Sequence, residues 1–358
     1  MFALRCSAYL CKMFDNSERT EIGAMGEFGL IQHLSQHFEV KNSKTVKGIG
    51  DDCAVIDCGD HFGLLTTDLL LEGVHFDLSF HPLKHLGYKA ISVAISDVYA
   101  MNAMPTQITL SIGLSSRFSV EAIEEFYEGV YAACEKYGVD LVGGDTSSSL
   151  KGFVISVTAI GEVTPDKHVL RSTAQSGDLI CVSGDVGGAF LGLTIMEREK
   201  KIYLENPQVQ PDLEGEDYIV GRLLKPEARK DIIEFFANNN ITPTSMMDVS
   251  DGISSEVLHL CKQSNLGCRV YEEKLPIHDD ARMAAFKFGL DPTVCALNGG
   301  EDYELIFTLK QEDYDKITLN EEISVIGYMA DIEEGCKFLT KGGNTHPITA
   351  QGWNAFTK

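Results

Sequence analysis

The chain has no long hydrophobic run. Its 358 residues are 44% hydrophobic, yet no stretch of about 18 apolar residues occurs, so we expect no membrane-spanning helix. Residues 1–12 contain only a short apolar stretch and no clear cleavage site, which argues against a secretory signal. We therefore interpret residues 1–20 as a disordered extension, with Met13 as an alternative start, and we expect a cytoplasmic protein.

Zinc-type cysteine patterns are also missing. The ten cysteines form no CxxC pair and no Cys/His cluster at the spacing of a zinc site. Most of them sit in apolar company, as Cys181 does between Ile180 and Val182. This placement is typical of buried, reduced thiols in the cytosol.

Basic residues are scarce. Lys and Arg number 30 against 53 Asp and Glu, which gives a net charge of −23. This balance argues against nucleic acid or a membrane surface as a partner, because both carry negative charge. Solubility explains much of the excess. Several acids, however, stand in apolar or glycine-rich segments, where a solvated surface is a poor explanation.

The known patterns for phosphate loops and for nucleophilic catalysis are absent as well. There is no GxxxxGK[ST] loop, no protein-kinase catalytic loop and no GxSxG elbow. Phosphoryl transfer depends mostly on positioning and charge neutralisation, so metal ligands from separate segments are sufficient for it. We therefore expect metal-assisted chemistry, with no covalent nucleophile and no general base.

Strand and helix patterns alternate along both halves of the chain. This alternation predicts an α/β or α+β fold, and the length predicts two domains. We place the N-terminal domain at residues 21–164 and the C-terminal domain at residues 165–358. A helix is predicted from Leu83 to Met101. The segment from Glu197 to Gly221 is charged and contains two prolines, so we predict a surface excursion there.

Acidic segments recur where an apolar strand or helix runs into Gly, Ser or Thr. In Gly48–Val55 the carboxylates of Asp51 and Asp52 are adjacent. They repel by roughly 4 kcal/mol if held about 4 Å apart at an effective dielectric constant near 20. A cation that prefers oxygen ligands, such as Mg²⁺, removes that cost. The alternative is a solvated loop.

Two further acidic segments follow in the first half. Thr66, Thr67 and Asp68 are predicted to end an apolar strand with three oxygen ligands, and a turn or helix cap is the alternative. Asp97 lies in an apolar helix, where an isolated carboxylate is costly and requires a metal or a paired group. His75 is either structural or a ligand for phosphate or substrate.

Glycine accompanies the remaining acids. We predict a turn at Gly144 and Asp145, whose amides can bind phosphate while the carboxylate holds a metal; a simple tight turn is the alternative. Asp248, Ser250 and Asp251 stand between a predicted strand and a predicted helix, where a doubled N-cap is the alternative. The segment 299–302 again places carboxylates on a flexible turn. A metal, a substrate amine or a nearby Arg could satisfy these carboxylates.

Taken in order, these segments resemble the thiamine-monophosphate kinase family of the aminoimidazole-ribonucleotide-synthetase-like ATP-binding superfamily. The marks are GIGDDCAV, TTD followed by EGVHF, the SD of the helix, GGDT, MDVSDG and GGEDYEL. The resemblance runs from about Gly26 to Trp353. Each mark is weak alone, and their order makes the resemblance specific.

The resemblance implies transfer of the γ-phosphate of ATP to thiamine monophosphate, with several Mg²⁺ ions and direct in-line attack by the acceptor phosphate. It also implies two α/β domains. The N-terminal domain, with a mixed sheet, binds ATP and metal and joins the same domain of a second subunit in a barrel-like homodimer interface.

Carried over residue by residue, the resemblance implies the following roles. The implied metal ligands are Asp51 or Asp52, Thr66, Thr67, Asp68, Asp97, Asp145, Asp248 and Asp251. The implied ATP contacts are Tyr127, Gly144, Asp145, Arg171 and Ser250. The implied contacts to the thiamine side are His75, Glu301 and Trp353.

Two of these roles have clear alternatives. Arg171 is either a phosphate clamp or one half of a surface ion pair. Trp353, the only tryptophan, either docks the tail or stacks on a cationic ring of the substrate. The sequence departs from the family in this tail, where Asn354 and Ala355 replace the usual acid and histidine.

Two other functions remain open at this point. A sister enzyme, such as selenophosphate synthetase or aminoimidazole-ribonucleotide synthetase, shares the superfamily; the former needs a reactive cysteine in an N-terminal glycine-rich segment, and none fits well. A non-catalytic protein that binds metal or nucleotide is the other alternative. The full set of acids argues against it, because buried like charges without metal are costly.

Overall fold

The structure is a computed structural model that describes residues 20–351. The extension predicted over residues 1–20 lies outside this range except for its last residue. By their contacts, residues 42–351 belong to one compact unit and residues 20–41 to a second, small unit. The helical elements of the small unit are η2 (Ile22–Ala24) and α2 (Gly26–Ser35).

Six strands form the first sheet of the larger unit. Neighbouring strands are antiparallel except for β4 and β5, which are parallel, so the sheet is mixed. The sheet is open, with β1 and β5 at its edges. In spatial order the strands are β1 (Thr45–Lys47), β2 (Ala54–Asp57), β3 (Phe62–Leu71), β6 (Val154–Val163), β4 (Met104–Leu114) and β5 (Asp140–Ser148).

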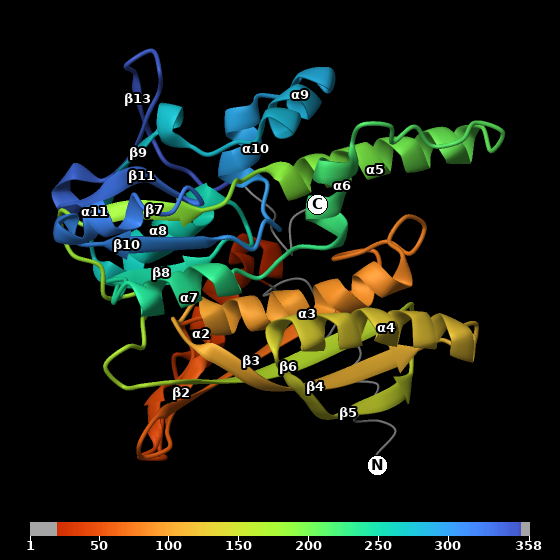
Figure 1. Cartoon of the computed structure of the whole chain (residues 1–358), viewed down its shortest axis with the longest axis horizontal. Helices are drawn as coiled ribbons and strands as arrows, with labels where there is room; N and C mark the ends of the chain where they lie inside the picture. Colours follow the sequence, from red (N-terminus) through yellow and green to blue (C-terminus); the bar gives the residue numbers. More distant parts are fainter. Residues whose placement is uncertain (1–19, 352–358) are drawn as a thin grey trace. The chain divides into compact units, whose positions relative to one another are not determined.

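Two helices cover one face of this sheet (Figure 1): α3 (Leu83–Tyr99) and α4 (Val120–Tyr137). They pack against each other through glycines. A Cβ atom on Gly87 would lie 2.0 Å from the backbone oxygen of Phe126, and one on Gly129 would lie 1.8 Å from that of Lys84. Both positions therefore require glycine for the helices to approach this closely.

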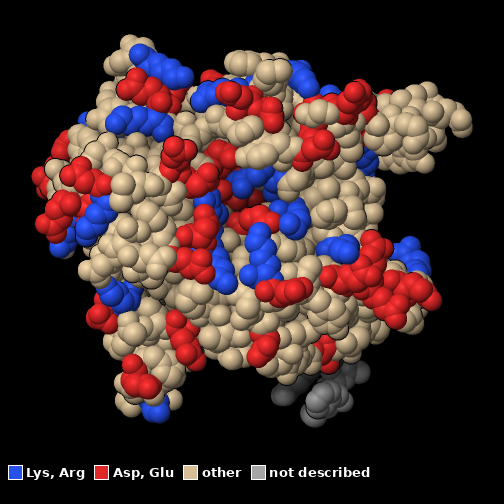
Figure 2. All heavy atoms as spheres, viewed as in Figure 1, with Lys and Arg blue, Asp and Glu red and all other residues tan. Residues whose placement is uncertain are grey.

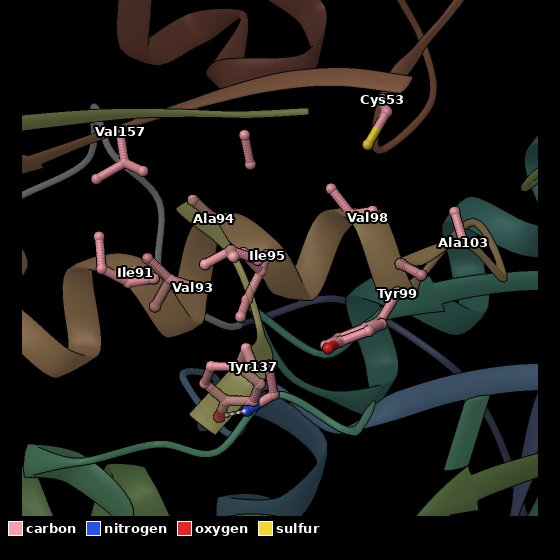
Figure 3. Packing of buried hydrophobic residues seen from close by; sticks show 14 of the residues in the cluster. Cys53, Ile91, Val93, Ala94, Ile95, Val98, Tyr99, Ala103, Tyr137 and Val157 are labelled. Carbon is pink, nitrogen blue, oxygen red and sulfur yellow. Dashed lines mark hydrogen bonds between the residues drawn. The ribbon is translucent and has the colours of Figure 1, made fainter. Parts of the chain in front are cut away.

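Helix α3 lies at the centre of the hydrophobic core. Figure 3 shows Val98 pointing toward the side on which Cys53 and Val157 lie, with Tyr99 and Tyr137 on the opposite side of the helix. All five side chains are buried. A helix buried around its circumference holds its polar residues in a fixed, water-poor environment, which is important for the acid near its C-terminal end.

Within residues 42–351, no helix covers the opposite face of the first sheet. Successive side chains of a strand point to opposite faces. In β3, Leu64 and Leu70 are buried on the helix side, whereas Leu65, Thr67 and Leu69 are exposed on the other side. We call this second side the outer face.

A second mixed sheet contains seven strands. One of its faces joins the core around α3, where Phe236 and Phe307 pack edge to face, and the other packs against α5, α8, α9 and α10. Every residue of β10, which lies between β7 and the edge strand β8, is buried. In spatial order the strands are β13 (Thr345–Pro347), β12 (Cys336–Leu339), β9 (Gly267–Tyr271), β11 (Ile323–Ala330), β7 (Leu179–Ser183), β10 (Leu305–Leu309) and β8 (Ser245–Asp248).

Helices and short 3-10 turns connect the strands of the second sheet. The helices are α5 (Gly188–Glu205), α6 (Asp217–Leu224), α7 (Lys230–Asn238), α8 (Ile253–Ser264), α9 (Asp279–Lys287), α10 (Pro292–Asn298) and α11 (Tyr314–Ile317). The 3-10 turns are η3 (Glu272–Lys274), η4 (Gln311–Asp313) and η5 (Ile332–Glu334).

The predicted mixed α/β architecture is confirmed, with one sheet within residues 45–163 and another within residues 179–347. The domain boundary at residues 164 and 165 stays a prediction, as does the barrel-like interface, because the first sheet is open in the single chain. In the described part of the chain, no helix is both long and apolar enough to cross a membrane.

Three local predictions are wrong. Gly144 and Asp145 do not form a turn, because β5 pairs with β4 through both residues. Asp68 does not end its strand, since the β3–β6 ladder continues to Leu71. The predicted surface excursion over 197–221 contains the second half of α5 and the start of α6, so only residues 206–216 lie outside helices there.

Candidate functional site

Three aspartates from separate segments meet in the interior of the larger unit. Asp52 precedes β2, Asp97 lies in the last turn of α3, and Asp248 ends β8. Each offers a carboxylate oxygen, and these oxygens all lie within 4.8 Å of one another. The core connects their elements, because Ser96 of α3 donates a hydrogen bond from its Oγ to Asp248 Oδ2 at 2.7 Å. We call Asp52, Asp97 and Asp248, together with Asp68, the aspartate cluster.

Strand β3 contributes the side chains of its helix-facing side. The hydroxyl of Thr66 donates to Asp97 Oδ2 at 2.6 Å. Asp68 is two residues further along the same face, and its Oδ2 atom is buried without a hydrogen-bond partner among residues 20–351. The alternation of the strand therefore directs Thr66 and Asp68 inward and Thr67 to the outer face.

Burial makes the charged form of this cluster costly. It raises the pKa of Asp68 and of Asp248, and the neighbouring carboxylate of Asp52 raises the pKa of Asp248 further. Burial, followed by the charges of Asp68 and Asp248, raises the pKa of Asp97 well above its ordinary value. Asp97 also stands at the C-terminal end of a helix, where the macrodipole disfavours an anion. A positive charge at this place would relieve all of these effects.

Arg171 reaches the cluster from the segment before β7. Its guanidinium binds Asp52 through two hydrogen bonds, from Nε to Oδ2 at 2.8 Å and from Nη2 to Oδ1 at 2.5 Å. Its backbone N–H donates to Asp51 Oδ1 at 3.2 Å. Burial, followed by the charge of Asp52, raises the pKa of Asp51 to about 6. The ion pair of Arg171 is thus buried in the site, which corrects the alternative of a surface pair.

The donor set of the cluster fits a hard divalent cation. Carboxylate and hydroxyl oxygens converge here, and Mg²⁺ and Ca²⁺ prefer such ligands. Among the described residues, no Lys or Arg lies within ion-pair distance of Asp68, Asp97 or Asp248, and the protein partners of the last two are neutral hydroxyls. The unpaired buried oxygen of Asp68 is the clearest sign that the cluster suits a cation.

Ser250 and Asp251 reach the same region by the pairing of β8 with β10. Beyond the ladder, the backbone N–H of Glu301 donates to Ser250 O at 2.8 Å. A Cβ on Gly300 would lie 2.5 Å from that same oxygen, so the close approach requires glycine. Glu301 and Tyr303 have positive φ angles, 61° and 52°, which are uncommon for residues with side chains. The loop is therefore held in a specific shape beside Ser250.

The doubled N-cap considered for Asp248 and Asp251 is wrong. The N-cap of α8 is Gly252, which offers no side chain. The side chain of Glu256, one turn into α8, reaches back instead, and its Oε1 accepts from the backbone N–H of Ser250 and of Asp251 at 3.2 and 2.8 Å. Neither aspartate is therefore the N-cap of α8.

Lys89 connects two of the predicted substrate residues. Its Nζ, buried in α3, donates to Glu301 Oε2 at 2.5 Å and to the backbone oxygen of His75 at 3.3 Å. The structure thus brings His75 and Glu301, 226 positions apart in the sequence, to one buried cation. Figure 2 shows basic and acidic side chains side by side in a hollow at the middle of the viewed face.

Four predicted residues do not join this group within one chain. Thr67, Gly144 and Asp145 lie on β3 or on the edge strand β5, and both Thr67 and Asp145 are exposed. Tyr127 lies on α4 where that helix meets Gly87, and Gly87 is ten residues, or roughly 15 Å, from Asp97 along α3. Its ring packs near Phe126 and Tyr131.

Trp353 lies outside the described residues. Sequence reasoning missed Lys89 and Glu256, although a signal for each was present. Both interrupt apolar helical segments with a charge, as Asp97 does, and both are 1% exposed. The same cost of burying a charge that singled out Asp97 therefore identifies them as well.

Known proteins are similar to this chain over these same elements. A family model described as the N-terminal domain of AIR synthase related protein matches residues 50–163, which contain β2 to β6 with α3 and α4. The thiamine-monophosphate kinase of Aquifex aeolicus is 36% identical over 335 residues, which cover 93% of this chain and 98% of the relative. That of Bacillus subtilis is 30% identical over 338 residues, with 93% and 100% covered.

A solved structure is also similar to this chain. AaThiL complexed with AMPPCP and TMP matches with a TM-score of 0.81 at 34% sequence identity, covering 95% of this chain and 100% of that chain. The similarity therefore extends over both sheets, and it confirms the family resemblance drawn from the ordered segments.

Proposed function

The chain belongs to the thiamine-monophosphate kinase family, and we propose that it transfers the γ-phosphate of ATP to thiamine monophosphate, giving thiamine diphosphate and ADP. The AMPPCP and TMP bound by its structural relative correspond to these two substrates. The single observation that carries the proposal is the aspartate cluster, in which Asp68, Asp97 and Asp248 are buried together without an ion-pair partner among the described residues.

We propose Mg²⁺ as that cation. The residues that would hold it are Asp51 or Asp52, Thr66, Asp68, Asp97, Asp248 and Asp251. When bound, Mg²⁺ offsets the negative charge of the phosphate oxygens. The chain itself orients the ligands: Thr66 and Ser96 fix the carboxylates of Asp97 and Asp248 by hydrogen bonds, and the dense core around α3 keeps water out.

The nucleotide is assigned to the side of the cluster formed by Arg171 and Ser250. A guanidinium offers a planar fork of donors that suits phosphate oxygens. Arg171 is fixed by Asp52, and its backbone oxygen accepts hydrogen bonds from Ser245 and Ser264. The fork is therefore preorganised, and ATP binding requires only that it share its donors between Asp52 and a phosphate.

The acceptor is assigned to the other side, near His75 and Glu301. Lys89 holds the carboxylate of Glu301 in place, and this carboxylate is the proposed contact for the cationic thiazolium ring of the substrate. Stacking of Trp353 on that ring remains an expectation from the resemblance.

The reaction needs no base from the protein. An oxygen of the acceptor phosphate is already an anion, so no proton has to leave before it forms a bond to the γ-phosphorus. The bond between that phosphorus and the bridging oxygen of ADP breaks as the new bond forms. Positioning then supplies most of the catalysis.

We propose a homodimer that completes the site. Thr67 and Asp145 share the outer face but are three strands apart, roughly 14 Å at about 4.8 Å per strand. This is too far for one ion, whose ligands lie about 2.1 Å from it. A second copy that covers the exposed apolar side chains of this face, Leu65 and Leu69 among them, would place Asp145 of the partner subunit near Thr67.

We also propose a cytoplasmic location. The eight cysteines within the described residues are free thiols. Compartments that keep thiols reduced, such as the cytosol, suit a protein with this many buried cysteines.

The test is an acceptor assay. Purified full-length protein is incubated with MgATP and either thiamine monophosphate or free thiamine, and the products are separated by chromatography. Thiamine monophosphate is expected to give the diphosphate, and free thiamine to give no product. Turnover of another phosphate acceptor without turnover of thiamine monophosphate would contradict the proposal and favour a sister enzyme.

A further inference from the structure

Three cysteines that are far apart in the sequence meet at the second sheet. Cys261 lies in α8, Cys268 in β9 and Cys336 in β12. Their three sulfur atoms all lie within 4.8 Å of one another. Strands β9 and β12 run parallel with Cys268 directly opposite Cys336, and α8 packs on β9 to bring Cys261 above the pair. We call these residues the thiol cluster.

The sulfur atoms are near enough for one metal ion, since each lies within 4.8 Å of the other two. In a tetrahedral zinc site, Zn–S bonds of about 2.3 Å place the sulfur atoms roughly 3.8 Å apart. Side-chain rotations that shorten the sulfur–sulfur distances to this value would direct all three sulfurs to one ion.

The surroundings of the thiol cluster suit a metal complex with a net negative charge. Three thiolates around a divalent cation carry one net negative charge. The guanidinium of Arg269, next to Cys268 in the sequence, is fixed by hydrogen bonds to the backbone oxygens of Cys268 and Gly335 at 2.8 and 3.0 Å, and it also pairs with Glu334. Cys336 is half-buried, which leaves solvent access for a water as fourth ligand.

We propose that Cys261, Cys268 and Cys336 form a binding site for one thiophilic divalent metal ion. Zn²⁺ is the ion of this class that we expect in the cell. Soft thiolate ligands select such metals over Mg²⁺, so the site is chemically distinct from the aspartate cluster. Binding displaces the thiol protons to solvent, and it forms three metal–sulfur bonds without any change of oxidation state.

The position of the thiol cluster suggests what the ion does. Ser250 and Asp251 stand directly before α8, and Cys261 lies in the third turn of the same helix. A metal that connects Cys261 to β9 and β12 fixes α8 to the sheet. The inference does not depend on the proposed kinase activity, because it rests on ligands outside that site.

The experiment is a titration of the reduced full-length protein with Cd²⁺ under anaerobic conditions. Thiolate–cadmium bonds give an ultraviolet charge-transfer band that carboxylate ligands do not give. We expect the band to saturate at one equivalent per chain, and Zn²⁺ to displace Cd²⁺ with loss of the band. Zn²⁺ is also expected to raise the Tm.

Two variants decide the assignment. Cys336→Ser changes the half-buried member of the cluster and is expected to bind Cd²⁺ at least tenfold more weakly and to lose the Tm response to Zn²⁺. Cys295→Ser, a buried cysteine in α10 outside the cluster, is the matched control and should titrate as the wild type does.

Three results would overturn the site. They are the absence of a band at one equivalent, a band of equal strength and affinity in Cys336→Ser, and a disulfide within the cluster of the untreated protein with no metal uptake after reduction. The Tm of metal-free Cys336→Ser shows separately whether that variant folds.

Discussion

Two groups of buried acids in this molecule, one at the second sheet and one in the aspartate cluster, have different kinds of partner. At the second sheet, Glu304 Oε2 accepts from Arg229 at 2.5 Å and from Ser183 at 2.5 Å, and its Oε1 lies 3.0 Å from Arg222. Asp302 accepts from the backbone N–H groups of Gly187 and Ala189 at 2.6 and 3.2 Å. In the aspartate cluster, Asp68, Asp97 and Asp248 have hydroxyl partners or none.

The difference separates structural acids from candidate ligands. Guanidinium and backbone N–H groups donate to the carboxylates of Asp302 and Glu304, and these acids hold the glycine turn before α5. The acids of the GGEDYEL segment therefore have two different roles. Glu301 pairs with Lys89 at the proposed acceptor site, whereas Asp302 and Glu304 support the fold. Uncompensated burial, rather than burial alone, is what indicates a cation site.

The largest expected effect is the loss of catalysis in the Asp68→Asn variant. The change keeps shape and removes one charge that the cluster contributes to the transition state. We expect kcat/KM for thiamine monophosphate to fall roughly 10³-fold, about 4 kcal/mol. Initial rates by chromatography measure it. The Tm without metal should not fall, because a repelling charge is lost, and a rate within threefold of wild type would remove Asp68 from the site.

The second effect concerns the homodimer. If Asp145 acts at the site of the partner subunit, Asp68→Asn and Asp145→Asn are each nearly inactive, and their mixed dimers contain one intact site. Random exchange of equal amounts should restore about a quarter of wild-type activity. Rates before and after subunit exchange measure this. If both variants stay inactive after subunit exchange has been confirmed, Asp145 acts at the site of its own chain or at no site.

The third effect is on stability at the second sheet. Glu304→Gln leaves Arg229 and Arg222 without their buried carboxylate, and we expect the free energy of unfolding to fall by about 3–5 kcal/mol. Urea denaturation measures it. The matched control is Glu322→Gln, an exposed partner of Arg229 at 3.4 Å, which should cost less than about 1 kcal/mol. Equal losses in both variants would contradict the distinction between the two regions.

The smallest effect is on acceptor binding. Lys89→Met preserves the length of the buried side chain but removes the cation beside Glu301. We expect KM for thiamine monophosphate to rise roughly tenfold, about 1.4 kcal/mol, with a smaller change in kcat. Lys84→Met, on the same helix in an exposed pair with Glu128, is the control and should leave KM unchanged. A fall in kcat alone would place Lys89 in the fold rather than at the acceptor.

The sequence was sufficient for features that a local pattern carries. The helix around Asp97, the strand around Thr66 and Asp68 and the ordered acidic segments all follow from short-range periodicity and from the cost of burying charge. The structure places Asp52, Asp97 and Asp248 together, although their roles as ligands stay a prediction until metal binding is measured.

Features that depend on pairing between distant segments were not predictable in this way. Gly144 and Asp145 have the composition of a turn, and only the ladder with β4 makes them a strand. The thiol cluster has no recognisable spacing, because parallel pairing of β9 with β12 brings Cys268 and Cys336 together across 68 positions. Lys89 carried a readable signal, but its partner Glu301 is 212 positions away.

The central claim is that the aspartate cluster binds a hard divalent cation, and the most direct measurement is the Tm as a function of Mg²⁺ concentration without nucleotide. The account predicts that the Tm of the wild type rises with Mg²⁺, because bound metal stabilises the folded state. Asp97→Asn should begin at an equal or higher Tm and respond less. A wild-type Tm that does not change with Mg²⁺, or an equal response in Asp97→Asn, would contradict the claim.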